Sequence, residues 1–474
     1  MVFPVVGGTQ DTGYEIENSC QFNTDAYCEF TPSSGSGSTQ FTISAWVKNC
    51  GAGALSEDGF IISGKDADNG LKLLSGGSNG KIQFIEYAGG SDAAYYIRTN
   101  RLFRDPSAWM HVVLIYDAPD GTAGDRMRLY INGTRETSFS HEVQLPQDRA
   151  HAGFTRSSVA IRVGSQASGS NSRFNGYLAD VYFCDGQNYE PSEFGETDDN
   201  GVWIPKKADV SFGTNGFKLE FKQTGTSANS SGIGADTSGN DNHFSVSGLA
   251  AENITTDTPT NNFCTMSPLY SYSGITFSEG NLQTNLGGSN HRWGTSTFFV
   301  ANGKWYFECK LLSDSNYNSG PGVIAYGIDD PITTEGGGAG SKAEGWIYLS
   351  TNAGDLQHGG TQYGTASAAT TNDILMVAFD VDNGKIWIGK NGTWSEGSNP
   401  STGNGAVRED LGDASSGLFS PGVSGYAENM VFNFGNPTFS ISSGNADANG
   451  YGNFEYAVPS GFYSLCTKNL AEYG

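Results

Sequence analysis

The sequence predicts an all-β protein made of two tandem antiparallel β-sandwiches, with helix content below ~10%. Several segments alternate apolar and polar residues with a period of two, and none keeps a 3.6-residue period. Glycine accounts for 66 of 474 residues, about twice the usual ~7%. Charged residues make up 16% of the chain, against ~25% in typical soluble domains. This composition favours short strands and tight turns over long charged helices.

The first predicted elements are three strands in the N-terminal part of the chain. Residues 41–48 alternate strictly, with Phe41, Ile43, Ala45 and Val47 on one face and Thr42, Ser44, Trp46 and Lys48 on the other. Residues 109–117 are apolar on both faces, as a central buried strand should be. Residues 127–135 alternate again, and Asn132-Gly133 supplies the left-handed turn of a tight hairpin.

The order of these strands closely resembles the laminin-G-like, concanavalin A-like lectin sandwich. Residues 174–183 add an FxGxLAxVxF pattern that resembles the closing strand of such domains. We therefore expect a first domain, a concanavalin A-like jelly roll, over residues 1–222. The resemblance implies a recognition surface on a β-sandwich and points away from a catalytic cleft.

Residues 223–264 have the composition of a linker, poor in apolar residues and rich in Ser, Asn, Asp, Gly and Thr. Within them, residues 236–240 and 257–261 carry Asp, Asn, Ser and Thr side chains of the kind that form hydrogen-bonded turns. We therefore expect an irregular but ordered surface strap between two domains.

A second domain is expected over residues 265–474. Four motifs follow one another in it, namely KWYFE, AFDVDNGKIWIGKNGTW, LFSPGVS and FNFGNPTF. Their content and order resemble the SPRY domain over about residues 275–440, which implies a second β-sandwich. The tail, residues 454–470, is expected to pack back on this domain as a C-terminal cap.

The combination of a laminin-G-like sandwich, the segment FGETDDNGVWIPKK and a SPRY-like unit resembles structural proteins of tailed bacteriophages. This resemblance implies a non-enzymatic virion protein, assembled in the host cytoplasm, that acts as a fibre or appendage. Its implied partners are other virion structural proteins and a host-surface glycan, and we expect it to form a homotrimer. A capsid decoration protein serving assembly only is the alternative, and a secreted carbohydrate-active enzyme is a second alternative.

The formal net charge of −24 creates a field that repels nucleic acid and anionic membranes. The longest apolar runs, such as residues 112–116, are too short to cross a bilayer. The first ten residues, MVFPVVGGTQ, lack a basic leader and a long apolar segment, so no signal peptide is expected. We therefore expect no nucleic-acid partner and no membrane insertion.

The cysteines number seven, with no CxxC pair and no histidine at zinc-ligand spacing. Cys309 shares a strand face with Trp305 and Phe307, so we expect it to be a small buried apolar residue. Cys20 and Cys28 have the same interpretation, although a bridge between them across a hairpin stays open. No cofactor is expected, with calcium as the single candidate.

The sequence predicts no catalytic residues. A glycosidase needs two carboxylates about 5–10 Å apart, and the E-x-D-x-E run that concanavalin A-like glucanases use for this purpose is absent. The G-x-S-x-G motif of serine hydrolases is absent too. His111 stands inside the buried strand 109–117, so we expect a hydrogen-bonded core histidine.

Aromatic residues in or beside Gly- and Ser-rich loops are the candidate ligand-binding residues, since sugar rings stack on exposed aromatic faces. They are Tyr95, Tyr96, Tyr317, Trp346 and Tyr363. Each has a simpler interpretation as the anchor of its own loop. Asp66 and Asp68 are a candidate calcium site because they open a sequence like an EF-hand loop, although Gly77 stands where the twelfth-position ligand belongs.

Overall fold

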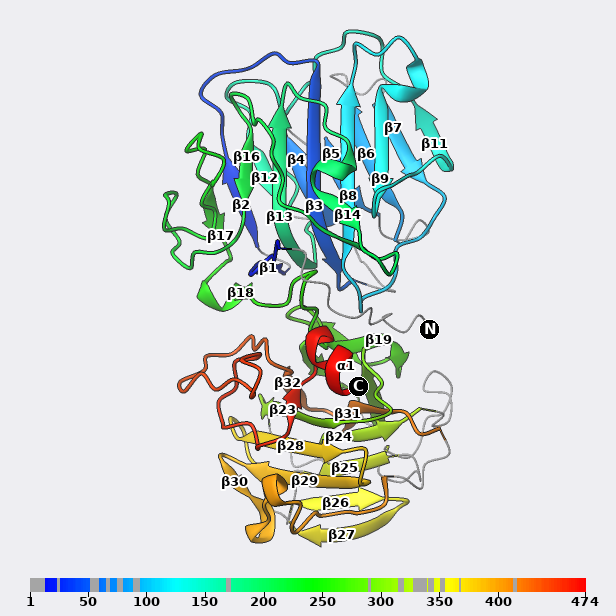
Figure 1. The fold of residues 1–474 in the computed structure, drawn as a ribbon, viewed down its shortest axis with the longest axis vertical. Coiled ribbons are helices and arrows are strands. Elements are labelled where there is room, and N and C mark those ends of the chain that lie inside the picture. Colours follow the sequence, from blue (N-terminus) through cyan, green and yellow to red (C-terminus); the bar gives the residue numbers. More distant parts are fainter. Residues whose placement is uncertain are drawn as a thin grey trace. The chain divides into compact units, whose positions relative to one another are not determined.

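The computed structural model describes residues 13–23, 26–51, 59–64, 69–74, 80–87, 94–167, 172–288, 291–313, 319–326, 339, 345–349, 354–365, 368–411 and 416–474. These residues fall into two compact units, residues 13–260 and residues 261–474 (Figure 1). Both are almost entirely β, and the only α-helix in the described part of the chain is α1 (Thr467–Tyr473). The predicted fold class is therefore confirmed. No helix among the described residues is long and apolar enough to span a membrane.

The first unit contains an antiparallel sheet that we call the front sheet. Its strands are, in spatial order, β10 (Thr134–Arg135), β9 (Met127–Ile131), β8 (Met110–Asp117), β3 (Gln40–Asn49), β13 (Gly176–Asp185), β1 (Ser19–Phe22) and β18 (Ile254–Thr255), with β16 (Phe217–Leu219) paired beside β13. The hairpin from β9 to β10 turns at Asn132 and Gly133, whose φ values of 48° and 73° are those of the predicted left-handed turn.

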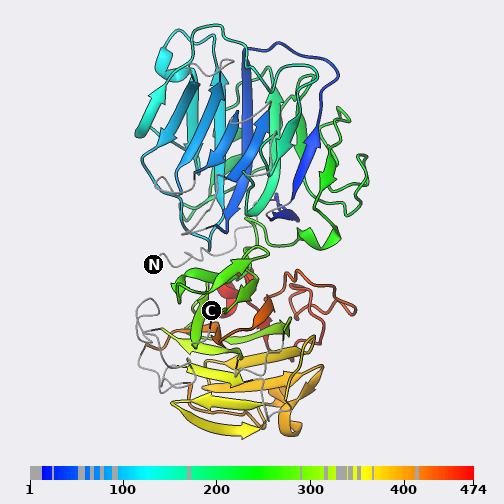
Figure 2. The same cartoon turned by 180° about the vertical axis from the view of Figure 1, so that it is seen from behind.

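A second antiparallel sheet, the back sheet, completes this sandwich (Figure 2). Its strands are, in spatial order, β11 (Phe139–Val143), β7 (Ala94–Thr99), β6 (Ile82–Tyr87), β5 (Gly70–Leu73), β4 (Gly59–Gly64), β12 (Ile161–Val163), β2 (Tyr27–Phe30) and β17 (Ser245–Ser247). A separate small hairpin follows β13 in the chain and consists of β14 (Gly195–Thr197) and β15 (Trp203–Pro205).

The main core of the first unit lies between the front and back sheets. The alternation predicted for β3 is confirmed, because its apolar set Phe41, Ile43, Ala45 and Val47 belongs to this core. The strand β8 is apolar on both faces because its outer side chains are covered as well. There Val113 and Ile115 pack with Phe194 and Phe212 from the segment that follows β13.

Residues 223–260 belong to the first sandwich, which differs from the surface strap expected between two domains. The strands β17 and β18 pair with β2 and β1, so this segment extends both sheets. It also contributes Ile233, Phe244 and Leu249 to the main core. The observed boundary between the units therefore lies near residue 260 and not at residue 222.

A buried ion pair fixes the end of this segment to the front sheet. Lys48 Nζ lies 2.7 Å from Asp257 Oδ2, and both side chains are fully buried. The indole of Trp109 donates a hydrogen bond of 3.0 Å to Asp257 Oδ1. A charge buried without its partner is strongly destabilising, so Asp257 and Lys48 must be buried together.

The second unit has two further antiparallel sheets. The first contains β19 (Met266–Ser271), β22 (Arg292–Ser296), β31 (Phe419–Gly425), β24 (Gly320–Ala325), β25 (Gly345–Leu349), β26 (Asp355–His358) and β27 (Thr361–Thr365). The second contains β20 (Thr276–Ser278), β21 (Gln283–Asn285), β32 (Asn429–Asn433), β23 (Lys304–Leu311), β28 (Ile374–Asp380), β29 (Lys385–Lys390) and β30 (Thr393–Trp394), with β33 (Tyr463–Ser464) parallel to β23.

The C-terminal segment packs on this unit, as the sequence predicts. Phe454 and Phe462 join a cluster with Tyr306 and Trp387 on the outer side of the β23 sheet. The buried carboxylate of Glu308 accepts hydrogen bonds from the backbone N–H groups of residues 455 and 456, at 3.0 and 2.8 Å. This cap therefore satisfies a buried charge as well as covering apolar surface.

All seven cysteines lie among the described residues, and each is buried and outside any disulfide bond. Cys309 is fully buried beside Trp305 and Phe307 in the core, which confirms its expected role. Cys20 and Cys28 are free and lie in β1 and β2, which belong to opposite sheets of the sandwich and not to one hairpin.

The place of residues 223–260 in the first sandwich gives a prediction about fragments. We expect residues 1–260 to fold with one cooperative thermal transition. A fragment ending at residue 222 should aggregate or melt far lower, since it lacks two strands and leaves Lys48 buried without its counter-charge. Loss of one partner of a buried ion pair alone costs ~3–5 kcal/mol of unfolding free energy.

Thermal melts followed by circular dichroism give the melting temperatures of the purified fragments 1–222, 1–260 and 261–474. Fragment 261–474 controls for the way in which the fragments are prepared. Equal melting temperatures for the two N-terminal fragments would contradict the assignment of residues 223–260 to the first sandwich.

Candidate functional site

Two of the predicted ligand-binding residues, Tyr95 and Tyr96, are neighbours in β7 and are both half-buried. Tyr95 packs against the main core, with the guanidinium carbon of Arg149 4.9 Å from its ring centre. The ring of Tyr96 lies 5.9 Å from that of His141 in β11. Because consecutive strand residues point to opposite faces, these two rings do not form one shared platform.

Trp346 corrects the sequence-based expectation of an exposed ring, because it is fully buried. It lies in β25, stacks on His358 at 4.5 Å, and donates its indole hydrogen to Asp410 at 2.9 Å. Tyr363 in β27 is half-buried, with the guanidinium carbon of Arg408 3.6 Å from its ring centre. The structure therefore brings Trp346 and Tyr363 into one internally bonded cluster that anchors these strands.

The remaining predicted site residues, Tyr317, Asp66 and Asp68, lie outside the described residues. The calcium site therefore stays a prediction. Within the described ranges, no group of three or more His, Cys, Asp or Glu side chains is placed to hold a metal ion.

His111 is a core histidine with both ring nitrogens bonded. Its Nε2 lies 2.8 Å from Ser44 Oγ, and Trp203 Nε1 lies 3.1 Å from its Nδ1. An indole N–H can only donate, so Nδ1 accepts and the proton sits on Nε2, which donates to Ser44. The Ser44–His111 pair therefore has the wrong tautomer for a general base, and complete burial lowers the pKa of His111 from 6.5 to about 3.

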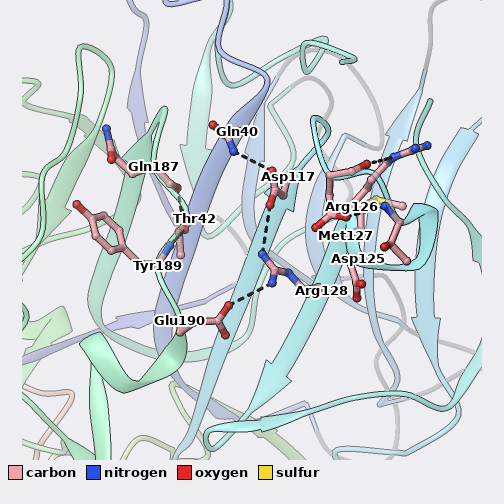
Figure 3. A network of polar contacts seen from close by, with 12 residues as sticks. Gln40, Thr42, Asp117, Asp125, Arg126, Met127, Arg128, Gln187, Tyr189 and Glu190 are labelled. Carbon is pink, nitrogen blue, oxygen red and sulfur yellow. Dashed lines mark hydrogen bonds and ion pairs between the residues drawn. The ribbon is translucent and has the colours of Figure 1, made fainter. Parts of the chain in front are cut away.

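A network of polar side chains lies on the outer face of the front sheet (Figure 3). Strand register places it there: Gln40 pairs with Asp117, while Thr42 pairs with Ile115 and Ile115 with Arg128. Gln40, Thr42, Asp117 and Arg128 therefore lie in adjacent rows on one face. We call this network, together with Tyr189 and Glu190, the Arg128 patch.

Arg128 is the centre of the patch. One terminal nitrogen of its guanidinium lies 3.4 Å from Asp117 Oδ2, and the other lies 3.2 Å from Glu190 Oε1 (Figure 3). Gln40 Nε2 donates to the second oxygen of Asp117 at 2.8 Å. The side chains of Arg128 and Asp117 are 16% and 14% exposed, whereas that of Glu190 is 53% exposed, so the patch reaches solvent chiefly through Glu190.

The chain segment after β13 is fixed to the patch by Thr42. The Thr42 hydroxyl donates to the carbonyl oxygen of Gln187 at 2.9 Å and accepts from the backbone N–H of Tyr189 at 2.9 Å. These two bonds place Glu190 beside Arg128. Two buried atoms here, Arg128 Nε and Asn188 Oδ1, have no hydrogen-bond partner among the described residues.

Tyr130 stands next to the patch on β9 and belongs to the cluster that covers the outer face of the front sheet. Burial raises the pKa of its phenol, and a hydrogen bond to Glu190 raises it further. The phenol therefore stays protonated near neutral pH and can donate to the Glu190 carboxylate.

Chemically, the patch suits hydrogen bonding to hydroxyl groups. It offers guanidinium donors from Arg128 on β9 and carboxylate acceptors from Asp117 on β8 and from Glu190 in the segment after β13. Both carboxylates are held against the same guanidinium, at 3.4 and 3.2 Å.

Sequence reasoning missed Asp117, Arg128 and Glu190 as candidate site residues. Arg128 could have been identified from the sequence, because strand alternation over residues 127–131 makes it an outward-facing charge. Glu190 could not be identified in this way, because its position depends on the two hydrogen bonds of the Thr42 hydroxyl, and Thr42 lies 147 residues before Tyr189 in the chain.

Comparison with known families bears on the first unit. Residues 22–187 match the family model Laminin_G_3, described as the concanavalin A-like lectin/glucanases superfamily. The match covers β3, β8, β9 and β13 and ends just before Tyr189 and Glu190. The laminin-G-like resemblance of this part of the chain is therefore confirmed. No curated protein matches the chain.

Solved structures similar to parts of the chain include the SPRY domain of human HERC1, with 18% identity and a TM-score of 0.29, which covers 35% of this chain and 96% of that one. A putative carbohydrate-binding protein from Bacteroides ovatus has 16% identity and a TM-score of 0.31, over 51% of this chain and 60% of that one. A native heptameric SAP-like pentraxin from Limulus polyphemus has 14% identity and a TM-score of 0.25, over 37% and 79%. At these values the similarities assign no function.

The bonding of His111 predicts that its imidazole does not take up a proton between pH 8 and pH 4. Its folded pKa lies below the unfolded value, so the folded state resists protonation. His111 therefore leaves the free energy of unfolding unchanged above about pH 6.5. Below that pH it lowers the free energy of unfolding by at most ~1.4 kcal/mol per pH unit as the pH falls toward 3.

An NMR titration of the His111 ring-proton chemical shifts from pH 8 to pH 4 tests this prediction. His111→Gln is the control, because its amide can bond both Ser44 and Trp203 without titrating. A His111 midpoint near pH 6 would contradict the assigned tautomer and burial.

Proposed function

We propose that this protein is a non-enzymatic virion structural protein, a fibre or appendage of a tailed bacteriophage, whose first unit recognises a host-surface glycan. The Arg128 patch is the observation that carries the recognition role. It is a set of hydrogen-bonding side chains, in which Asp117 and Arg128 lie on strands of the segment that matches a lectin superfamily and Glu190 lies just beyond that segment. The virion role rests on the order of motifs along the chain and its resemblance to phage structural proteins.

The patch is built to bind without large rearrangement. Arg128 and Asp117 stand on paired strands, and Glu190 is placed by the two hydrogen bonds of the Thr42 hydroxyl. Side chains held in this way lose little conformational entropy when a ligand binds, so more of the hydrogen-bond energy appears as affinity. Glycan hydroxyls would donate to the carboxylates and accept from the guanidinium.

We further propose that the protein works as a homotrimer joined to other virion structural proteins. A virion appendage is built on symmetry, and several copies of one modest glycan site act together as a tighter multivalent site. Native mass spectrometry of the full chain reads out the number of copies.

The central prediction of this proposal is glycan binding that depends on Arg128. On an array of neutral, amino and acidic glycans, the full chain should bind a defined subset. Arg128→Met should weaken that binding roughly 10- to 100-fold, because each hydrogen bond to a charged group contributes ~1.5–3 kcal/mol. No reducing ends should be released from a bound glycan.

Arg101→Met is the matched control, since Arg101 also contacts a carboxylate, Glu136 at 3.1 Å, and is 58% exposed. It should leave binding unchanged. Binding to no glycan would overturn the recognition role and favour a decoration protein that serves assembly only. Hydrolysis that Asp117→Asn or Glu190→Gln abolishes would overturn the non-enzymatic role.

A further inference from the structure

The charges of the Arg128 patch carry information about its ligand. The terminal nitrogens of Arg128 lie 3.4 Å from Asp117 and 3.2 Å from Glu190, so one cation stands between two anions. The guanidinium therefore has no terminal nitrogen left without a carboxylate. An incoming anionic group would meet a cation whose charge two carboxylates already offset, so an ion pair with it would gain little.

The accessible group of the patch is negative. The side chain of Glu190 is 53% exposed, while those of Arg128 and Asp117 are 16% and 14% exposed. A ligand approaching from solvent therefore meets the Glu190 carboxylate first. This carboxylate can form a salt bridge with an ammonium group and can accept a hydrogen bond from a hydroxyl, but it repels another carboxylate.

The cations nearest to Arg128 in sequence are bonded to groups outside the patch. Arg126 bonds the backbone carbonyl oxygens of Asp120 at 2.9 Å and Leu145 at 2.8 Å. Arg135 contacts the carboxylate of Asp125. Across the whole chain the formal net charge is −24, which adds a long-range field of the same sign.

We infer that the Arg128 patch selects glycans by charge, in the order amino sugar, then neutral sugar, then uronic acid. This inference rests on the proposed glycan-recognition function and deepens it by naming the class of sugar. The selecting groups are the carboxylates of Glu190, which faces solvent, and of Asp117 behind it. The general negative field of the molecule is screened beyond about 8 Å at 0.15 M salt.

Three β-1,4-linked hexamers that share one backbone provide the test: glucosamine, glucose and glucuronic acid. Isothermal titration of the full chain at 0.05 and 0.3 M NaCl should show the glucosamine hexamer binding several-fold more tightly than the glucose hexamer. The glucuronic acid hexamer should bind at least roughly tenfold more weakly than the glucose hexamer. The order should persist at 0.3 M NaCl, because the selecting charges are local.

Glu190→Gln separates the local effect from the field of the whole protein. It removes one charge while keeping a hydrogen-bonding amide, so it should reduce the preference for glucosamine over glucose. Glu136→Gln is the matched control, since it removes the same charge beside Arg101 and should leave the preference unchanged.

The possible results distinguish failure of the charge-selection inference from failure of the glycan-recognition function. The predicted order, reduced by Glu190→Gln alone, supports the inference. Equal or tighter binding of the glucuronic acid hexamer overturns it and leaves the glycan-recognition function standing. The predicted order with equal effects of both variants also overturns it, because net charge and not the patch would then select. Failure of every hexamer and every array glycan to bind overturns the proposed function itself.

Discussion

The ion pair between Lys48 and Asp257 is the constraint on which the first unit depends. Its two side chains are fully buried and lie 209 residues apart in the chain. Neither charge can be buried without the other, so β3 reaches its native environment only when the segment ending at Asp257 is in place. The pair thereby closes a sandwich whose strands come from both ends of residues 13–260.

The strand β3 connects this constraint to the Arg128 patch. Lys48 stands near its C-terminal end, while Gln40 and Thr42 stand at its N-terminal end. Thr42 then positions the segment that carries Glu190. The outer face of the front sheet is thus covered in its middle by Phe194, Trp203 and their neighbours, and is polar at Arg128, where Glu190 reaches solvent.

Much of this fold could be predicted from the sequence, because strand alternation is a local property. The inward set of β3 and the turn at Asn132 follow from residue order alone. The buried state of Lys48 could not be predicted, since its partner is remote and the strap is polar in composition. The exposure expected for Trp346 was wrong for the same reason: it stands beside Gly- and Ser-rich segments, but tertiary packing buries its ring in β25. Arg128 could be found as an outward-facing charge, whereas its pairing with Glu190 depends on the fold.

A crystal structure of the full chain with the glycan that binds most tightly on the array tests whether the Arg128 patch is the binding site. We expect sugar density on the outer face of the front sheet, with hydroxyl or amino groups within hydrogen-bond distance of Arg128 and Glu190. Density elsewhere, on Tyr95 and Tyr96 or on the second unit, with the Arg128 patch empty, would contradict it.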